Sequence, residues 1–397
     1  MMISMKKTGL LAMLLSCLSA CSSYDTESME QLTDRVFSLA EVQFTQMDSQ
    51  LTPTTLPRSL NEDGTLRTSD IGWWCSGFFP GSLWYVYEYT HHESVADLAL
   101  KNTLKLDSLQ YRPTDHDIGF QMSSSYGNAY RLTGNEDYMR VMRVGAWKLA
   151  ERFNPVCGVT RSWDFLRKGW KYPVIIDNMM NLDLLLDVAS HFQDDSLAYI
   201  ACRHADVTMK NHFRPDYTSY HLVNYDPEDG HVISRETVQG YADESAWSRG
   251  QAWALYGYTM MYGHTHDWRY LEQAVRIADV ILPRLPSDGI PFWDFDAPDG
   301  EEFRDSSAAS IMASALVALS GYAGNDTYLQ MAEKQMRTLA SPSYLADAGT
   351  NGGFLLRHGV GNKPDNSEVD VPLTYADYYF LEALLRYKNL KNSQKQP

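Results

Sequence analysis

The stretch Ser306-Ser-Ala-Ala-Ser-Ile-Met-Ala-Ser-Ala-Leu316, with the turn Gly324-Asn-Asp-Thr-Tyr328 that follows it, shows the pattern that decides the fold. The first segment is rich in small residues, which allow helices to pack closely. After the turn, residues 328–339 carry apolar side chains at three- and four-residue steps, as in an amphipathic helix with one face in solvent. This stretch therefore predicts a helical hairpin with a buried inner arm and a half-exposed outer arm.

The same kind of polar turn, followed by an aromatic or apolar anchor, recurs along the chain between two helical patterns. The five turns begin at His91, Gly134, Gln193, His264 and Gly324. Adding one helix near residues 28–49 and one near 374–389 gives six pairs of inner and outer helices. We therefore predict an all-α, single-domain (α/α)6 barrel of six helical hairpins, closed by the terminal helices. An open helical solenoid is the alternative, but its repeats would be more regular in length.

The N-terminus has the features of a secretory signal. Lys6 and Lys7 precede a short apolar core, and Leu18-Ser-Ala-Cys21 resembles the lipobox of bacterial lipoproteins. We expect residues 1–21 to be a lipoprotein-type signal peptide ending at Cys21, and residues 22–397 to form the barrel. This places the protein in a bacterial cell envelope, in the periplasm, with a lipid at Cys21 as its contact with a membrane. An ordinary cleaved signal is the alternative.

Charge and cysteine content exclude some classes of protein. The net charge of −16 argues against a nucleic-acid partner, and it means that an anionic ligand would need a local cluster of cationic residues. Cys75, Cys157 and Cys202 lie beyond the signal; they are odd in number and lack CxxC spacing, so they form neither a disulfide framework nor a zinc site. One disulfide or three unpaired thiols both stay open, as does the oligomeric state.

The connections from each outer helix to the next inner helix are long and rich in Gly, Pro and Trp. In a barrel they all emerge at the same end, and a functional site is expected where they converge. They cover residues 50–76, 154–176, 214–242, 285–304 and 341–372.

Several inner helices are expected to begin with an acid at this end, and most such acids should be N-caps. They are Asp117, Asp177, Asp243, Asp305 and Asp377. Asp177 follows the apolar run Tyr172-Pro-Val-Ile-Ile176, which should be extended and should shield it from water. Asp117 follows an imidazole, that of His116. Spacing alone does not separate the caps from acids with a chemical role.

A second group of residues suits a sugar ligand. Arg249 and Trp253 are four residues apart and share one helix face, where a guanidinium and an indole could hold a uronic acid. Alternatively Trp253 is a core residue and Arg249 pairs with Asp243 or Glu244.

Metal and cofactor chemistry is not indicated by the sequence. The chain has no HExxH, GxxxxGK[ST], EF-hand or GxSxG motif, so we expect no metal and no cofactor. His204, His212 and His264 are isolated, and we expect them to be solvated rather than to bind a metal.

Taken together, the motifs resemble those of the unsaturated glucuronyl hydrolases of glycoside hydrolase family 88, in the same order from about residue 30 to 388. The matching stretches are Trp74 with Ser76-Gly-Phe-Phe-Pro-Gly81, His116-Asp-Ile-Gly-Phe120, Ile176-Asp-Asn-Met-Met-Asn-Leu182, Gln239-Gly-Tyr-Ala-Asp-Glu-Ser245, Trp247-Ser-Arg-Gly-Gln-Ala-Trp253 and Asp305-Ser-Ser-Ala-Ala309. Such enzymes have an (α/α)6 barrel and use no cofactor. They remove the 4,5-unsaturated uronic acid that lyases leave at the non-reducing end of glycosaminoglycan disaccharides and oligosaccharides.

The resemblance implies a role for individual residues. Asp177 would protonate carbon 4 of the unsaturated ring and help deliver water to carbon 5, and Asp117 would hold substrate hydroxyls and modulate Asp177. Burial and a second carboxylate should raise the pKa of Asp177 more than its helix dipole lowers it. The residues implied to bind substrate are Trp74, His116, His221, Gln239, Arg249 and Trp253, with His358 and Lys363 as contacts for the next sugar or its sulfate. Residues 357–363 could instead be a structural glycine loop, and Val238 departs from the polar residue common in the family.

Two other functions stay open at this point. An unsaturated rhamnogalacturonyl hydrolase that acts on pectin fragments would share the barrel and the chemistry of Asp177. A lipid-anchored protein that only binds sugars would need the aromatic residues and Arg249 but not two buried acids. Neither the preferred glycosaminoglycan nor its sulfation follows from the sequence.

Overall fold

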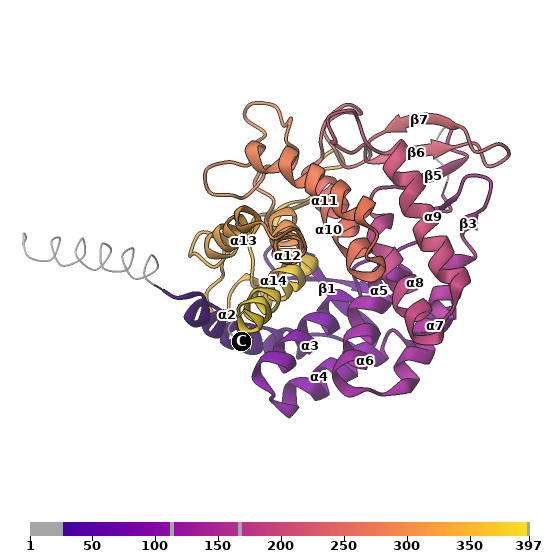
Figure 1. Cartoon of the computed structure of the whole chain (residues 1–397). Coiled ribbons are helices and arrows are strands. Elements are labelled where there is room, and N and C mark those ends of the chain that lie inside the picture. Colours follow the sequence, from indigo (N-terminus) through magenta and orange to yellow (C-terminus); the bar gives the residue numbers. More distant parts are fainter. Residues whose placement is uncertain (1–26, 112–114, 166–168, 395–397) are drawn as a thin grey trace, which may run out of the picture.

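The computed structural model describes residues 27–111, 115–165 and 169–394, and within them the helices form an inner and an outer ring (Figure 1). The inner ring consists of α3 (Phe78–Thr90), a segmented helix made of α5 (Ile118–Met122), the π turn η2 (Ser123–Gly127) and α6 (Asn128–Thr133), then α8 (Asn178–Phe192), α10 (Ser248–Thr265), α12 (Ser306–Ala323) and α14 (Thr374–Ser393). Each inner helix contacts the next, and α14 returns to contact α3. This closure confirms the predicted barrel and rules out the open solenoid.

In the outer ring, five helices each pair with the inner helix that precedes them in the chain, and the sixth, α2 (Met29–Asp48), pairs with α14. The other five are α4 (Glu93–Leu104), α7 (Glu136–Ala150), α9 (Asp195–Asn211), α11 (Trp268–Ile281) and α13 (Asp326–Leu339). The terminal helices α2 and α14 contact each other. They form the sixth pair, as the sequence predicts.

The five inner-to-outer turns share a local structure. Each inner helix ends at a residue with a left-handed backbone, at His91, Gly134, Gln193, His266 and Gly324. In four of the five turns an Asn or Asp then caps the outer helix through its side chain: Asn135, Asp194, Asp267 and Asn325. The signal that ends the inner helix and the cap that starts the outer helix thus lie close together in the chain, which keeps these turns short.

Small residues fill the inner ring, and α12 shows this most fully. Almost all of its side chains are buried, including its serines and alanines, because it packs against α10, α13 and α14. By length and composition alone, α12 is the one described helix that could cross a membrane, but 78% of that apolar window is buried inside the protein. Such burial is typical of a core helix in a barrel.

The long connections carry short antiparallel sheets, which the sequence analysis did not predict apart from the extended run before Asp177. The strands are β1 (Thr55–Leu60) with β2 (Leu66–Asp70), β3 (Phe153–Asn154) with β4 (Val159–Thr160), β5 (Tyr172–Ile175) with β6 (Leu222–Tyr225) and β7 (Val232–Glu236), and β8 (Gly359–Asn362) with β9 (Ser367–Val371). Figure 1 shows β5, β6 and β7 together at one end of the barrel. Three 3₁₀ helices complete the description: η1 (Asp107–Tyr111), η3 (Leu282–Arg284) and η4 (Asn351–Gly353).

The thiols of Cys75, Cys157 and Cys202 are all free in this fold, which excludes the single disulfide that the sequence left open. The expected signal peptide at residues 1–21 lies outside the described residues.

Candidate active site

A cavity of about 410 Å³ opens among the long connections, and it contains both acids that the sequence analysis singled out. Of the expected site residues it is lined by Asp117, Asp177, Gln239, Arg249 and Trp74. They come from four different connections or helix starts. The loop-rich end of the barrel is therefore where the predicted functional residues meet.

Asp177 occupies the N-cap position of α8 but does not cap the helix, because its own backbone is helical and its side chain accepts no capping hydrogen bond. Strand β5 carries it inward, with Val174 opposite Val223 of β6. The residue is 9% exposed, and its Oδ2 has no hydrogen-bond partner among the described residues. Burial raises the pKa of Asp177 to about 7, against the opposing effect of Arg249. The interpretation as a helix cap is therefore wrong.

Asp117 lies in a similar position, at the N-cap of α5 without a capping bond. Its carboxyl is surrounded by other acids: burial, Asp115 and Asp177 together raise its pKa well above the usual range. His116 is fully buried, with Nε2 3.5 Å from Oδ1 of Asp117, and burial lowers the pKa of this imidazole. A neutral imidazole next to a carboxyl that keeps its proton leaves the site uncharged at this point.

His221 approaches the other acid, with Nε2 3.7 Å from Oδ2 of Asp177. Its Nδ1 accepts hydrogen bonds from the backbone N–H groups of Val238 (3.0 Å) and Gln239 (3.2 Å). Because burial lowers the pKa of His221 to about 3, the ring is neutral and its proton lies on Nε2, facing Asp177. The structure thus places a hydrogen-bond donor beside the uncapped carboxyl.

Arg249 is almost completely buried and is held by the β8–β9 hairpin. Its guanidinium donates to the carbonyl oxygens of Val360 and of Gly361 (2.6 Å for Gly361) and lies 3.4 Å from Oδ2 of Asp305. The predicted alternative pairing with Asp243 or Glu244 is therefore wrong.

Trp253 is fully buried and packs against Phe120 and Tyr379, with ring centroids 5.0 and 5.4 Å away. It does not line the cavity, but its side chain interacts with Asp177 and opposes the rise in the pKa of that acid. Trp74 does line the cavity, supported by Tyr375 at 4.8 Å between ring centroids.

The β8–β9 hairpin reaches the cavity, but not through the residues that were expected. Gly361, Asn362 and Glu368 line it. His358 lies outside the lining and pairs with Asp370, and Lys363 pairs with Glu301 at 3.1 Å. Contact of His358 and Lys363 with a second sugar stays a prediction.

The remaining acids at this end are distinguished by their hydrogen bonds. Asp305 caps α12 by accepting from the backbone N–H of Ser307, and Asp377 accepts from two backbone N–H groups of the β8 connection. Asp243 accepts from the N–H of Thr237. These three acids have structural partners, whereas Asp117 and Asp177 face the cavity.

Two histidines that we expected to be solvated are instead buried and hold the site together, so that expectation was wrong. Nδ1 of His204 accepts from the backbone N–H of Thr160, and Nε2 of His212 lies 3.1 Å from the carbonyl oxygen of Val174. Burial lowers the pKa of both rings, to about 3 and about 4. As neutral rings they fix the strands that lead to Asp177.

Several lining residues were missed by the sequence analysis. They are Arg58, Asp115, Trp163, Phe165, Glu368 and Tyr375. Arg58 pairs with Glu368 and lies 3.7 Å above the ring of Trp73, and Trp163 stacks on Phe165. Asp115 could have been noticed beside His116 and Asp117, but loop residues such as Arg58 have no periodic signal.

Comparisons with known proteins agree with this site. No protein-family model matched the chain. It is 43% identical over 321 residues to an unsaturated glucuronyl hydrolase of Formosa agariphila, covering 80% of each chain. It is 32% identical to an unsaturated chondroitin disaccharide hydrolase of Streptococcus pneumoniae, covering 91% of this chain and 92% of that one.

Among solved structures, the fold matches an unsaturated glucuronyl hydrolase specific for heparin, with a TM-score of 0.89 and 46% identity over 91% of this chain and 98% of that one. The barrel, the paired acids and this level of similarity over most of the chain lead to one conclusion: the protein belongs to the unsaturated glucuronyl hydrolases.

Proposed function

We propose that this hydrolase removes the 4,5-unsaturated glucuronic acid from the non-reducing end of lyase-generated glycosaminoglycan oligosaccharides by hydrating the vinyl ether double bond. The observation that carries this proposal is the pair of buried carboxyls in one cavity, Asp117 and Asp177, neither of which caps its helix. A protein that only binds sugars has no use for two acids held against their burial cost.

Asp177 is suited to the proton transfer because its pKa of about 7 keeps part of the population protonated at neutral pH. It donates its proton to carbon 4, and the positive charge that develops on carbon 5 and the ring oxygen is quenched by water. The same carboxylate then takes a proton from that water. The product is a hemiketal at carbon 5, which opens, and the former anomeric carbon releases the next sugar.

The neighbouring residues position the two reacting carbons. Nε2–H of His221 can donate to the carboxylate that forms on Asp177, and Asp117, whose pKa is raised by burial and by the neighbouring acids, can donate to a substrate oxygen. Trp74 offers an aromatic wall, and Gln239 also lines the cavity and donates from Nε2 to the carbonyl oxygen of Gly361 at 3.1 Å. Arg249 supplies the positive field that an anionic uronic acid needs among these carboxyls.

Glycosaminoglycan fragments are favoured over pectin fragments by the names of the relatives, one a chondroitin disaccharide hydrolase and one a heparin-specific enzyme. The apolar Val238 in the lining is a local departure that should affect which sulfated sugar fits.

The direct test is a panel of unsaturated disaccharides from chondroitin, hyaluronan, heparin and pectin, with loss of the double-bond absorbance as readout. We expect turnover of at least one glycosaminoglycan disaccharide and a much lower rate on rhamnogalacturonyl substrates. The reverse order would assign the enzyme to pectin, and binding without turnover would contradict catalysis.

Reaction in D₂O tests the mechanism separately. Protonation of carbon 4 by Asp177 places one deuterium on that carbon, on one face only, in the first turnover. Direct displacement at the anomeric carbon places none there, and nuclear magnetic resonance of the early product distinguishes the two.

We also propose that the protein is a lipoprotein of the bacterial cell envelope, with its periplasmic barrel anchored through Cys21; the Leu18-Ser-Ala-Cys21 motif supports this. Cells given labelled palmitate should label the wild-type protein but not Cys21→Ala. Equal labelling of the two, or none of the wild type, would contradict the anchor.

A further inference from the structure

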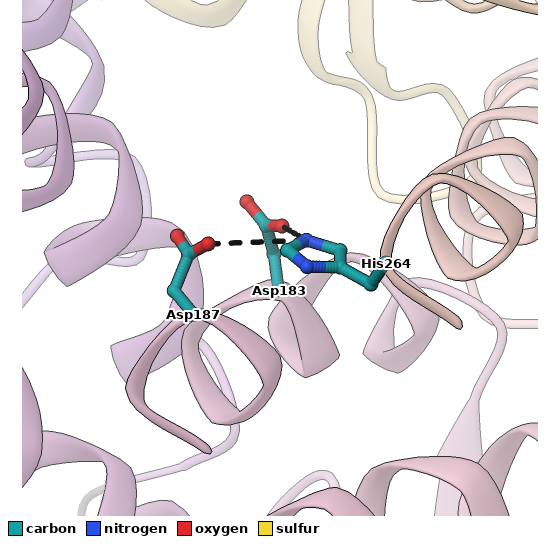
Figure 2. Close-up of side chains that lie close together, drawn as sticks. All are labelled: Asp183, Asp187 and His264. Atoms are coloured by element: carbon teal, nitrogen blue, oxygen red, sulfur yellow. Dashed lines mark hydrogen bonds and ion pairs between the residues drawn. The ribbon is translucent and has the colours of Figure 1, made fainter. Parts of the chain in front are cut away.

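In the middle of α8, outside the cavity that holds Asp177, three potential metal ligands converge. Asp183 and Asp187 lie one helical turn apart on α8, and His264 lies near the end of α10. Figure 2 shows both carboxyls directed toward the same edge of the imidazole. Nε2 of His264 is 2.8 Å from Oδ1 of Asp183 and 3.9 Å from Oδ1 of Asp187. Two helices that are far apart in sequence thus share one cluster.

The spacing of the ligand atoms fits a metal ion. One atom from each of the three residues lies within 4.8 Å of the other two. Ligands at about 2.0–2.1 Å from a tetrahedral Zn²⁺ are separated by about 3.3 Å from each other. The distances from Nε2 of His264 to the two carboxyl oxygens, 2.8 and 3.9 Å, lie on both sides of that value. Small side-chain rotations would therefore bring all three ligands onto one ion without moving the helices.

The cluster is accessible and leaves coordination positions open. All three residues line a cavity of about 600 Å³. Asp183 and His264 also line a neighbouring cavity of about 720 Å³. The nearby Arg386 is already paired with Glu382 at 3.2 Å and bonded to the hydroxyl of Tyr256. Because this guanidinium is engaged elsewhere, it does not neutralise the two carboxylates of the cluster.

Asp187 is the least satisfied of the three. Within the described part of the chain, its closest polar partner is the imidazole at 3.9 Å, which is too long for a hydrogen bond. One imidazole therefore does not fully compensate two adjacent acids, whereas a dication would.

We propose that Asp183, Asp187 and His264 bind a transition-metal dication, such as Zn²⁺ or Mn²⁺, that clamps α8 to α10. The imidazole ligand favours these ions over Ca²⁺ and Mg²⁺, which prefer oxygen ligands. Binding displaces the proton that His264 holds on Nε2 and releases it to solvent. Asp183 and Asp187 lie about 9 and 15 Å from Asp177 along the helix, and neither lines the cavity that holds Asp177, so the ion has no direct part in the chemistry.

The clamp would act where the two most important helices of the active site need support. The start of α8 carries Asp177, and the first turns of α10 carry Arg249 and Trp253. An ion that joins the middle of α8 to the end of α10 would stabilise the relative position of the two helices. We therefore expect an effect on stability and little on the turnover number at low temperature.

The test uses the full chain, stripped of metal with a chelator and then titrated with ZnCl₂, MnCl₂, CaCl₂ or MgCl₂. At about 100 times the Kd, ZnCl₂ should raise Tm by about 5 °C, and calorimetry should give one site per chain. CaCl₂ and MgCl₂ should give no comparable shift.

Variants separate this site from surface binding. The Zn²⁺-dependent shift should disappear in Asp187→Asn and in His264→Gln. The chain offers a matched control in a second cluster of two acids and a histidine, Asp226, Asp229 and His231, so His231→Gln should keep the shift. No shift in the wild type, or the same shift and stoichiometry in Asp187→Asn and His264→Gln, would overturn the proposal.

Discussion

Asp177 at the start of α8 and Asp183 further along the same helix each lie next to a histidine, at 3.7 Å from Nε2 of His221 and 2.8 Å from Nε2 of His264. The two pairs have opposite charge states. His221 is completely buried, and burial lowers its pKa to about 3. Burial also disfavours the charged form of His264, but Asp183 and Asp187 outweigh it and raise the pKa of that ring to about 9. Only the second pair is an ion pair at neutral pH.

The difference is explained by the surroundings rather than by residue type: His264 faces two carboxyls and is also closer to water. The side chain of His264 is 25% exposed and that of Asp183 34%, so solvent helps to stabilise both charges. In the active site the exposed fraction is 0% for the side chain of His221 and 12% for that of Asp177. Solvent therefore does little to stabilise a charge there. The helix α8 therefore carries a carboxyl prepared for proton transfer at its start and, further along, a carboxyl paired with a protonated imidazole.

The largest expected difference between the Asp177 and Asp183 positions is in catalysis. Asp177→Asn removes the proton donor and should lower kcat about 1,000-fold, which is within the range for a general acid. The matched variant Asp183→Asn, on the same helix, should stay within about twofold of the wild type. Both are measured by the loss of double-bond absorbance. Near-normal activity in Asp177→Asn would remove this acid from the mechanism and leave the enzyme family unaffected.

The pH dependence of turnover should follow the buried acid alone. Because Asp177 must be protonated to act and its pKa is raised to about 7, kcat should be constant well below pH 7 and fall about tenfold per pH unit above it. Asp183→Asn should leave this profile unchanged. A rate that stays flat up to pH 9 would show that another group gives the proton.

A third difference concerns stability at alkaline pH. The folded pKa of Asp177 is raised from 3.8 to about 7, so its contribution to stability is complete below about pH 3.8 and is lost as pH rises through 7. Asp177→Asn avoids that loss and should be more stable than the wild type at pH 8, by up to about 4 kcal/mol. Urea unfolding at pH 8 measures the gain, and a less stable variant would contradict the burial argument.

The smallest expected effect is at Asp183, where substitution should lower stability instead of raising it. Asp183→Asn weakens a partly exposed pair with His264 and should lower the free energy of unfolding by about 0.5–1 kcal/mol in metal-free protein. A double-mutant cycle with His264→Gln isolates the pair, and a coupling near zero would show that solvent screens it completely.

Most of the fold could be predicted from the sequence because its signals are local. The small-residue segment 306–316, the turn at Gly324 and the amphipathic segment after it are each decided by neighbours a few residues away. The sheets of the long connections were missed for the opposite reason: pairs such as Val174 with Val223 join residues far apart in the chain, and two- to six-residue strands have little periodicity.

The site was predicted in part, and the errors have a common cause. Asp117, Asp177 and Asp305 look alike in sequence as acids at helix starts, yet only Asp305 caps its helix. His204 and His264 look alike as isolated histidines, yet one is buried against a strand and the other meets two carboxyls. The backbone angles and neighbours that separate them belong to the folded chain.

The sequence by itself determined the helical hairpins, the closure of the barrel by the terminal helices, and the motifs that carry the family resemblance, since these depend on local periodicity and residue type. Only the tertiary structure decided which acids keep a proton. The pKa of Asp177 depends on burial by distant strands and on Arg249, and the charge of His264 depends on two carboxyls of another helix. Such interactions are set by distance in space, which spacing along the chain does not give.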